Sequence, residues 1–267
     1  MRTACSYFGI FSVLSGLLFA IFWPDSNYPQ VISHIVAVRT IDDIKDNLSG
    51  LTYDEETGSL YAIINHPPEI IQMDVRGNLI KRMSLTELGL EDTEGISAAG
   101  DEGFWVVEER KRRVVFVKIT SDGMIRESSC PVYDNGGKRN VGTEGIAWSE
   151  ENRVIFTANE KKPAAVFVAE LMSNGCFSEP ILIYSSSGDI AGLDWDIQRQ
   201  RLFILSEEDK TVTEIDVKGR IYRHSRLSDF LDDIPQPEGI AVNGDNLYIV
   251  SEPNHFYHFK LSSEPAL

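Results

Sequence analysis

Short hydrophobic runs alternate with turn residues along most of this chain. Leu60–Ile64 and Ile70–Val75 are apolar runs rich in β-branched residues, and the turn Arg76-Gly77-Asn78 leads into another run at Leu79–Met83. Runs of about five residues bounded by Gly, Asn and Asp are typical of β-strands joined by hairpin turns. The pattern predicts an all-β chain whose helical segments are single turns, near residues 86–90 and 229–234.

A short motif repeats with the strand pattern. Thr93-Glu94-Gly95-Ile96 recurs unchanged at residues 143–146 and with one change at 237–240, and more divergent copies stand at 48–51 and 190–193. The glycines of the five copies are residues 50, 95, 145, 192 and 239, so neighbouring copies lie 45 to 50 residues apart. A period of this length is typical of a repeat architecture such as a propeller.

The number of strands in each repeat predicts how the ring closes. Four repeats divide into four short strands, but the fifth ends after its third, Phe256–Leu261, while the β-rich run Val31–Ile41 is left over before the first repeat. Four-stranded sheets repeated around an axis are the blades of a β-propeller. We therefore predict a five-bladed β-propeller of four-stranded antiparallel blades, closed by the N-terminal strand. The alternative is six compact blades, which the chain is long enough to hold.

The N-terminal segment from Tyr7 to Trp23 contains no charged residue. Its length lies between a signal-peptide core and the roughly 20 residues of a membrane span. Arg2 precedes it and no small-residue cleavage site follows, which favours an uncleaved anchor with its N-terminus in the cytoplasm. We predict a transmembrane signal anchor at residues 1–25 and a propeller at 26–267, on the periplasmic side of a bacterial inner membrane. A cleaved signal peptide is the alternative.

Charge and cysteine content exclude some classes of partner. The chain has 41 Asp and Glu against 25 Lys and Arg, a formal net charge of -16, which argues against nucleic acid as a partner and is compatible with cation binding. Cys5, Cys130 and Cys176 match no zinc spacing. The strand pattern places Cys130 and Cys176 at opposite ends of neighbouring blades, beyond the ~7 Å Cα separation that a disulfide spans. We therefore predict no disulfide between them.

Oxygen-bearing side chains are predicted to form two rings at one mouth of the central channel. Glutamate precedes the motif glycine in three repeats, and further oxygen ligands stand at the end of each second strand. Calcium binds six to eight oxygens, whereas zinc, copper and iron favour His and Cys, which are not paired here. The predicted metal ligands are Glu94, Glu144, Glu238, Glu109, Asn159, Glu207 and Glu252. The alternative is that the glutamates only pack the blades.

Several of these segments resemble a known family. Residues 47–54, the two Thr-Glu-Gly-Ile copies and residues 190–194 are similar to the SdiA-regulated (YjiK-like) family, which is distantly similar to NHL-repeat propellers. The resemblance extends from about Val31 to the C-terminus. It implies a five-bladed propeller with bound calcium and no established biochemical activity.

Two functional hypotheses follow. The first is a membrane-anchored, monomeric module of the cell envelope that binds calcium together with a small molecule or an envelope protein. The second is a calcium-dependent hydrolase, such as a lactonase or phosphoesterase, that uses the same site. The sequence has no G-x-S-x-G motif and assigns no catalytic residue, although His66 lies in a loop at the same mouth.

Overall fold

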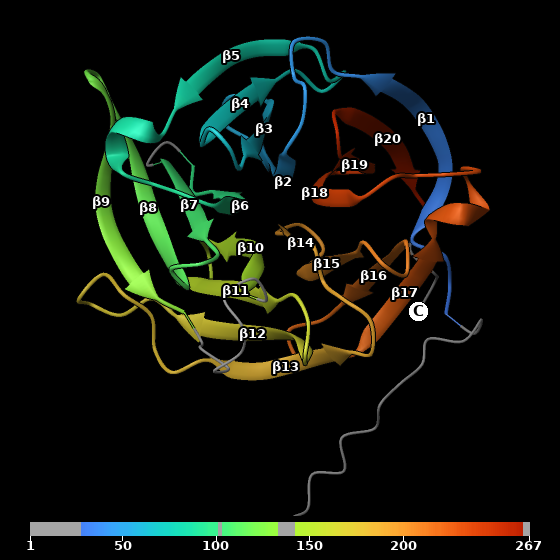
Figure 1. The fold of residues 1–267 in the computed structure, drawn as a ribbon. Coiled ribbons are helices and arrows are strands. Elements are labelled where there is room, and N and C mark those ends of the chain that lie inside the picture. Colours follow the sequence, from blue (N-terminus) through green and yellow to red (C-terminus); the bar gives the residue numbers. More distant parts are fainter. Residues whose placement is uncertain (1–27, 101–102, 133–141, 264–267) are drawn as a thin grey trace, which may run out of the picture.

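The computed structural model describes residues 28–100, 103–132 and 142–263, which form five four-stranded antiparallel sheets around a central axis (Figure 1). Blade one contains β2 (Leu48–Asp54), β3 (Ser59–Ile64), β4 (Glu69–Met73) and β5 (Leu79–Ser84), and blade two contains β6 (Thr93–Ala98), β7 (Gly103–Glu108), β8 (Arg113–Thr120) and β9 (Gly123–Pro131). Blade three contains β10 (Thr143–Ser149), β11 (Val154–Asn159), β12 (Ala164–Glu170) and β13 (Ile181–Ser186). Blade four contains β14 (Gly192–Asp196), β15 (Arg201–Ser206), β16 (Thr211–Ile215) and β17 (Ile221–Arg226). The described chain is thus a five-bladed propeller, as predicted.

The fifth blade is completed by the N-terminal strand. It contains β18 (Pro237–Asn243), β19 (Asn246–Ser251), β20 (His255–Leu261) and β1 (Ile32–Thr40), and β1 pairs antiparallel with β20. Two 3₁₀ turns, Thr86–Leu88 and Leu227–Asp229, lie near the places where single turns were predicted. Closure by β1 removes the open edge that β20 would otherwise expose.

The motif glycines let neighbouring inner strands approach around the ring. A Cβ added to Gly95 would lie 2.2 Å from the carbonyl oxygen of Glu144 in the next blade. One on Gly50 would lie 2.8 Å from the Glu94 carbonyl oxygen, and one on Gly239 would lie 2.7 Å from the backbone of Gly50. Only a residue without a side chain fits at such contacts, so the glycines set the spacing of the blades.

Side chains also hydrogen-bond one inner strand to the next. The hydroxyl of Thr52 accepts the backbone N–H of Ala98 at 3.1 Å, and that of Ser97 accepts the N–H of Trp148 at 2.9 Å. Between blades four and five a carboxyl oxygen of Asp194 accepts the N–H of Val242 at 2.7 Å. Thr52, Ser97 and Asp194 all lie two residues after a motif glycine, so the repeat itself supplies these contacts.

The hydrophobic core is divided into five clusters, each lying between two neighbouring blades. Trp105 and Trp148 belong to the cluster between blades two and three, with ring centroids 5.9 Å apart. Trp195 stacks on Phe156 between blades three and four, at 5.0 Å. The tryptophans are therefore packing residues between blades, as aromatic groups of this size commonly are.

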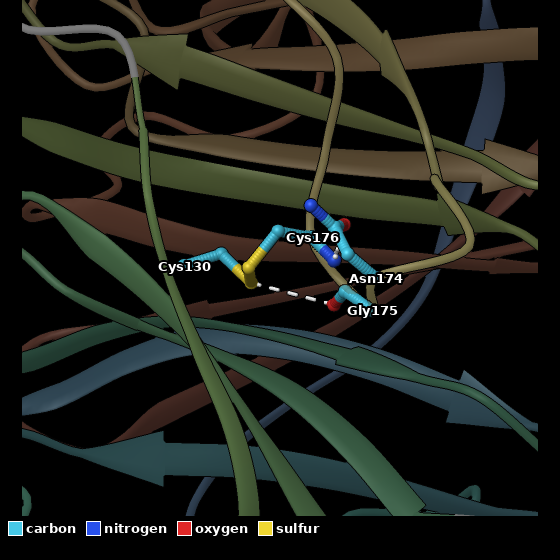
Figure 2. The surroundings of a disulfide bond; sticks show 4 residues. All are labelled: Cys130, Asn174, Gly175 and Cys176. Atoms are coloured by element: carbon cyan, nitrogen blue, oxygen red, sulfur yellow. Dashed lines mark hydrogen bonds between the residues drawn. A yellow bond between two sulfur atoms is a disulfide. The ribbon is translucent and has the colours of Figure 1, made fainter.

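A disulfide joins Cys130 and Cys176, so the sequence-based prediction of no disulfide is wrong (Figure 2). Their Cα atoms are 5.5 Å apart. Two features of the fold explain the error. The outer strands run around the circumference, so β9 ends beside the next blade (Figure 1). Cys176 is not in a strand but in the ten-residue loop 171–180 after β12, which packs back on blade two through Phe177 and Trp105.

Within the described ranges no helix is long and apolar enough to cross a membrane. The predicted anchor at residues 7–23 lies outside those ranges, and it stays a prediction.

Candidate metal centre

The glutamates before the motif glycines lie where the inner strands leave regular pairing. The register of β6 with β7 is interrupted between Thr93 and Ile96, and that of β10 with β11 between Thr143 and Ile146. The register of β18 with β19 is interrupted in the same way between Pro237 and Gly239. Because such bulges re-aim a side chain, they turn Glu94, Glu144 and Glu238 toward one face of the propeller. We call this face the carboxylate mouth.

Glu94 is held at the carboxylate mouth by two hydrogen bonds. Its Oε2 accepts the hydroxyl of Ser49 at 2.9 Å, and its Oε1 accepts the side-chain amide of Asn65. Burial, partly offset by the Ser49 hydroxyl, raises the pKa of Glu94 to about 8, and Glu109 and Asp92 add to the rise. A carboxyl with such a pKa is stabilised as a neutral acid until a cation offsets the repulsion.

The other two motif glutamates, Glu144 and Glu238, also have raised pKa values. Burial raises the pKa of Glu144 well above its usual range, and the charges of Glu160, Glu238 and Glu94 add to the rise. Burial likewise raises the pKa of Glu238 to about 8, with further contributions from Glu207 and Glu252. The three motif glutamates therefore converge on one desolvated, acidic region, where ionisation of each is disfavoured.

In blade three, the strand register places a different residue at the second-ring position, at the end of the second strand, from the one predicted from the sequence. Glu109 N–H donates to the Asp92 carbonyl at 3.0 Å, and the corresponding bond in blade three is from Glu160 N–H to the Gly142 carbonyl, also 3.0 Å. Glu160, not Asn159, is therefore the equivalent of Glu109. Asn159 instead lies in β11 opposite Thr143, and its amide donates to the carbonyl of Pro163 at 2.6 Å. Successive strand residues point to opposite faces, so an error of one position changes the side of the strand.

Two groups of three carboxylates come close enough to share an ion. Single oxygens of Asp92, Glu94 and Glu109 all lie within 4.8 Å of one another, and so do oxygens of Glu109, Glu144 and Glu160. Glu109 belongs to both groups, and burial raises its pKa to about 7 even though one of its oxygens accepts the Gly142 N–H at 3.0 Å. The carboxylate mouth is therefore most crowded between blades two and three, away from the symmetric centre.

The remaining predicted ligands lie outside these two groups. Glu207 pairs with Lys210 at 3.1 Å. Glu252 is half-buried, and burial followed by the charge of Asp46 raises its pKa. Its N–H donates to Gln236 in the same way that Glu109 bonds to Asp92. Glu207, Glu238 and Glu252 thus surround the mouth without joining the carboxylate groups.

Asp92 and Glu160 were not among the ligands predicted from the sequence. Asp92 directly precedes the motif, at the position held by Asp189 in blade four. The carboxylate of Asp189 accepts the N–H groups of Glu207 and Glu208 at 3.0 and 3.1 Å, which orders the loop after β15. Four of the five repeats have an oxygen-bearing side chain at this position, and this column was the signal that could have identified Asp92.

The donor chemistry fits calcium. All five residues in the two groups offer carboxylate oxygens, and neither group includes His or Cys. Calcium binds oxygens at 2.3–2.6 Å, so ligands on opposite sides of one ion are roughly 4.6–5.2 Å apart. The oxygens of each group lie within 4.8 Å of one another, so one ion could contact all three. Glu94, Glu109 and Glu144, together with Asp92 and Glu160, would hold the ion, which would neutralise their mutual repulsion.

A cavity of about 840 Å³ opens beside Asp92. His66 and Asn65 line it, as do Arg110 and Lys111. Arg110 pairs with Asp92 at 3.3 Å, so one wall of the cavity contacts the first carboxylate group. His66 therefore lies near the predicted metal site, in a space large enough for a small molecule.

The fold and the carboxylate mouth define a propeller with a candidate cation site at one mouth of its channel, between blades two and three. A sequence profile of the SdiA-regulated family matches residues 25–260, and the chain belongs to that family. This confirms the resemblance seen in the sequence.

Similar solved structures share the propeller architecture. They include a chain of a nidogen–laminin complex (TM-score 0.54, 15% identity, 76% of this chain and 72% of the other) and a gluconolactonase from Xanthomonas campestris (0.52, 12%, 89% and 96%). A luciferin-regenerating enzyme aligns with a TM-score of 0.50 and 14% identity over 84% of this chain and 95% of the other. At these identities the similarities show the fold alone.

Proposed function

We propose that this protein is an exported, membrane-anchored propeller that binds calcium at the carboxylate mouth and serves as a binding module of the cell envelope. The observation that carries the proposal is the pair of carboxylate groups that share Glu109. Carboxylates this close repel one another when ionised. Arg110 and Lys161 pair with Asp92 and Glu160 at 3.3 and 2.6 Å, whereas Glu94, Glu109 and Glu144 form no ion pair among the described residues. A divalent cation is the simplest partner that satisfies them.

Export is supported by the disulfide. Cys130 and Cys176 are bonded across two blades, and structural disulfides are typical of oxidising compartments outside the cytoplasm. The apolar segment 7–23 supplies a means of export and attachment. A calcium-binding propeller on that side of the membrane would meet the higher free calcium of an extracytoplasmic space.

Calorimetric titration of calcium into the purified full-length protein tests the proposal. We expect stoichiometric binding that Glu109→Gln weakens by at least about tenfold, because this residue belongs to both groups. Glu87→Gln is the matched control, since Glu87 is exposed on a 3₁₀ turn and belongs to neither group. Absence of calcium binding in the wild-type protein, or equal affinity in Glu109→Gln, would contradict the proposal.

A calcium-dependent hydrolase is the second candidate, favoured by the cavity beside Asp92. His66, Arg110 and Lys111 line that cavity, so an oxygen substrate held there would lie beside the carboxylate group and a candidate proton carrier. Hydrolysis of lactone and phosphoester panels with calcium or with chelator distinguishes the two functions. An enzyme requires turnover that calcium supports and His66→Asn reduces, whereas a binding module shows calcium binding without turnover.

A further inference from the structure

The five inner strands end around a second cavity, on the face opposite the carboxylate mouth. Every blade contributes to its lining through Tyr53, Ala98, Trp148, Trp195 and Asn243. The cavity volume is about 440 Å³, within the range of small-molecule sites. We call it the far mouth. The inner strands begin at the carboxylate mouth, so the length of the channel separates the two sites.

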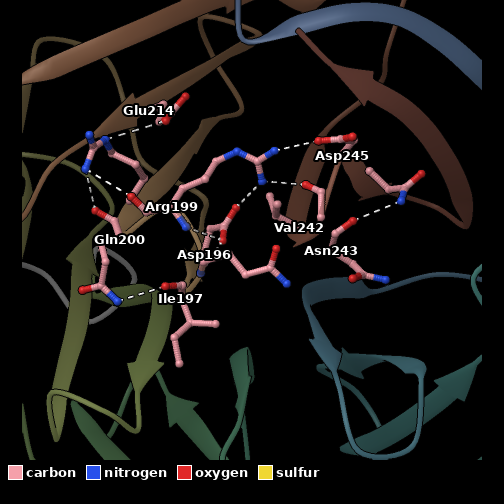
Figure 3. A network of polar contacts seen from close by, with 12 residues as sticks. Asp196, Ile197, Arg199, Gln200, Glu214, Val242, Asn243 and Asp245 are labelled. Atoms are coloured by element: carbon pink, nitrogen blue, oxygen red, sulfur yellow. Dashed lines mark hydrogen bonds and ion pairs between the residues drawn. The ribbon is translucent and has the colours of Figure 1, made fainter. Parts of the chain in front are cut away.

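The lining of the far mouth is acidic without compensating bases. Its acidic residues are Asp54, Glu55, Glu56, Glu150, Asp194 and Asp196, and its described lining contains no Lys, Arg or His. The charge of Asp196 is neutralised by Arg199, which is not part of the lining: the Arg199 Nη1 lies 2.6 Å from the Asp196 Oδ2 (Figure 3). The same guanidinium bonds the Gly244 carbonyl and Asp245, which fixes the rim between blades four and five.

The other carboxylates are not neutralised by bases in the described part of the chain. Glu55 and Glu56 are exposed on the turn after β2 and form no ion pair there. Glu150 accepts the indole N–H of Trp148 at 2.7 Å, and this bond leaves its charge in place. A cleft lined by one sign of charge concentrates cations, especially in a chain with a net charge of -16.

Two buried polar groups also belong to the far mouth. Asp194 is 7% exposed, and burial raises its pKa well above the usual range although Val242 N–H bonds it. Trp195 is 8% exposed, and its indole N–H has no hydrogen-bond acceptor among the described residues. A buried donor without an acceptor is energetically unfavourable. The nitrogen itself is covered, so an oxygen atom of a ligand in this cavity would satisfy it after a small shift of the lining side chains.

A bare metal ion does not fit the far mouth. Among the described residues, no three carboxylates there lie close enough to share one ion, in contrast to the carboxylate mouth. The cavity is also much larger than an ion, and aromatic residues form part of its wall. The lining instead suits an organic ligand with a positive charge and an oxygen acceptor.

We propose that the far mouth binds a small hydroxylated amine, with its ammonium group against the rim carboxylates and an oxygen accepting the Trp195 N–H. Ammonium N–H groups match the surplus of acceptors, and charge-assisted hydrogen bonds of this kind are stronger than neutral ones. The ligand enters the ring from the face opposite the carboxylate mouth, so its binding does not depend on calcium.

Calorimetry with the calcium-saturated full-length protein tests this proposal, using glucosamine as the probe and glucose and N-acetylglucosamine as neutral controls. We expect glucosamine to bind at least about tenfold more tightly than either control, because only it carries an ammonium group. Its affinity should fall as salt is raised. The combined variant Glu55→Gln, Glu56→Gln and Glu150→Gln should lose about tenfold or more in affinity.

Two further variants keep the test specific. Trp195→Phe removes the N–H while retaining an aromatic ring against Phe156, and it should weaken glucosamine binding about fivefold. Glu87→Gln should leave binding unchanged, and melting temperatures establish that each variant folds. Equal binding of glucose and glucosamine, displacement of glucosamine by calcium, or absence of glucosamine binding would each overturn the proposal. None of these outcomes bears on calcium at the carboxylate mouth.

Discussion

The calcium-free protein should lose stability as pH rises. Burial raises the pKa of both Glu94 and Glu238 to about 8 from an ordinary value of 4.5. A carboxyl whose pKa is higher in the folded state binds more protons when folded than when unfolded. The resulting stabilisation is fully present below about pH 4.5 and is lost progressively as pH rises to about 8.

The magnitude follows from the size of that window. Each pH unit within it is equivalent to about 1.4 kcal/mol, so one such carboxyl loses about 3 kcal/mol of stability between about pH 5.5 and 8. The glutamates repel one another, so their contributions are coupled and do not add. For a domain of this size, about 3 kcal/mol is equivalent to a fall of roughly 10 °C in melting temperature.

Differential scanning calorimetry in chelator and in excess calcium measures this effect. In chelator the melting temperature should fall between pH 5.5 and 8, whereas calcium should raise it most at pH 8, where protons no longer compete for the ligands. The double variant Glu94→Gln and Glu238→Gln should show a flatter pH dependence in chelator and a smaller calcium effect. A wild-type melting temperature that stays constant or rises to pH 8 in chelator would refute the reasoning.

Three further changes test the framework. Replacing Cys130 and Cys176 by Ser should lower the free energy of unfolding by about 4 kcal/mol, the value that the chain-entropy model gives for a separation of 46 residues. Urea unfolding without reductant measures this loss, and an unchanged free energy of unfolding would refute the cross-link. Glu214→Gln removes the charge paired with buried Arg223 and should cost about 3–5 kcal/mol in the same assay, whereas joint replacement of both by apolar residues should recover much of it. Gly95→Ala should cost more than about 2 kcal/mol, because its Cβ would lie 2.2 Å from a carbonyl oxygen of the next blade, and a neutral result would show that the blades can separate.

The period of the sequence was sufficient to predict the propeller. Each blade needs a glycine where inner strands touch, so the repeat of Gly50 and its counterparts reflects a packing constraint that every blade shares. The missing fourth strand of the last repeat likewise predicted closure by β1, because an unpaired sheet edge is unfavourable.

Details that depend on twist and register were not accessible from the sequence. Cys130 and Cys176 meet because β9 runs around the circumference and a long loop reaches back to it, and neither feature has a local sequence signal. Glu160 was overlooked in favour of Asn159 because strand ends are uncertain by one or more residues, and one position reverses the direction of a side chain. The motif glutamates were identified because they recur, whereas Asp92 was not, because the residue type at its position changes from repeat to repeat.

An anomalous difference map from crystals of the full-length protein grown with calcium tests the central claim most directly. It should show a calcium ion within about 2.6 Å of carboxylate oxygens from Glu109 and from at least two of Asp92, Glu94, Glu144 and Glu160. A map with no calcium peak at the carboxylate mouth, while these carboxylates keep their close approach, would contradict the account.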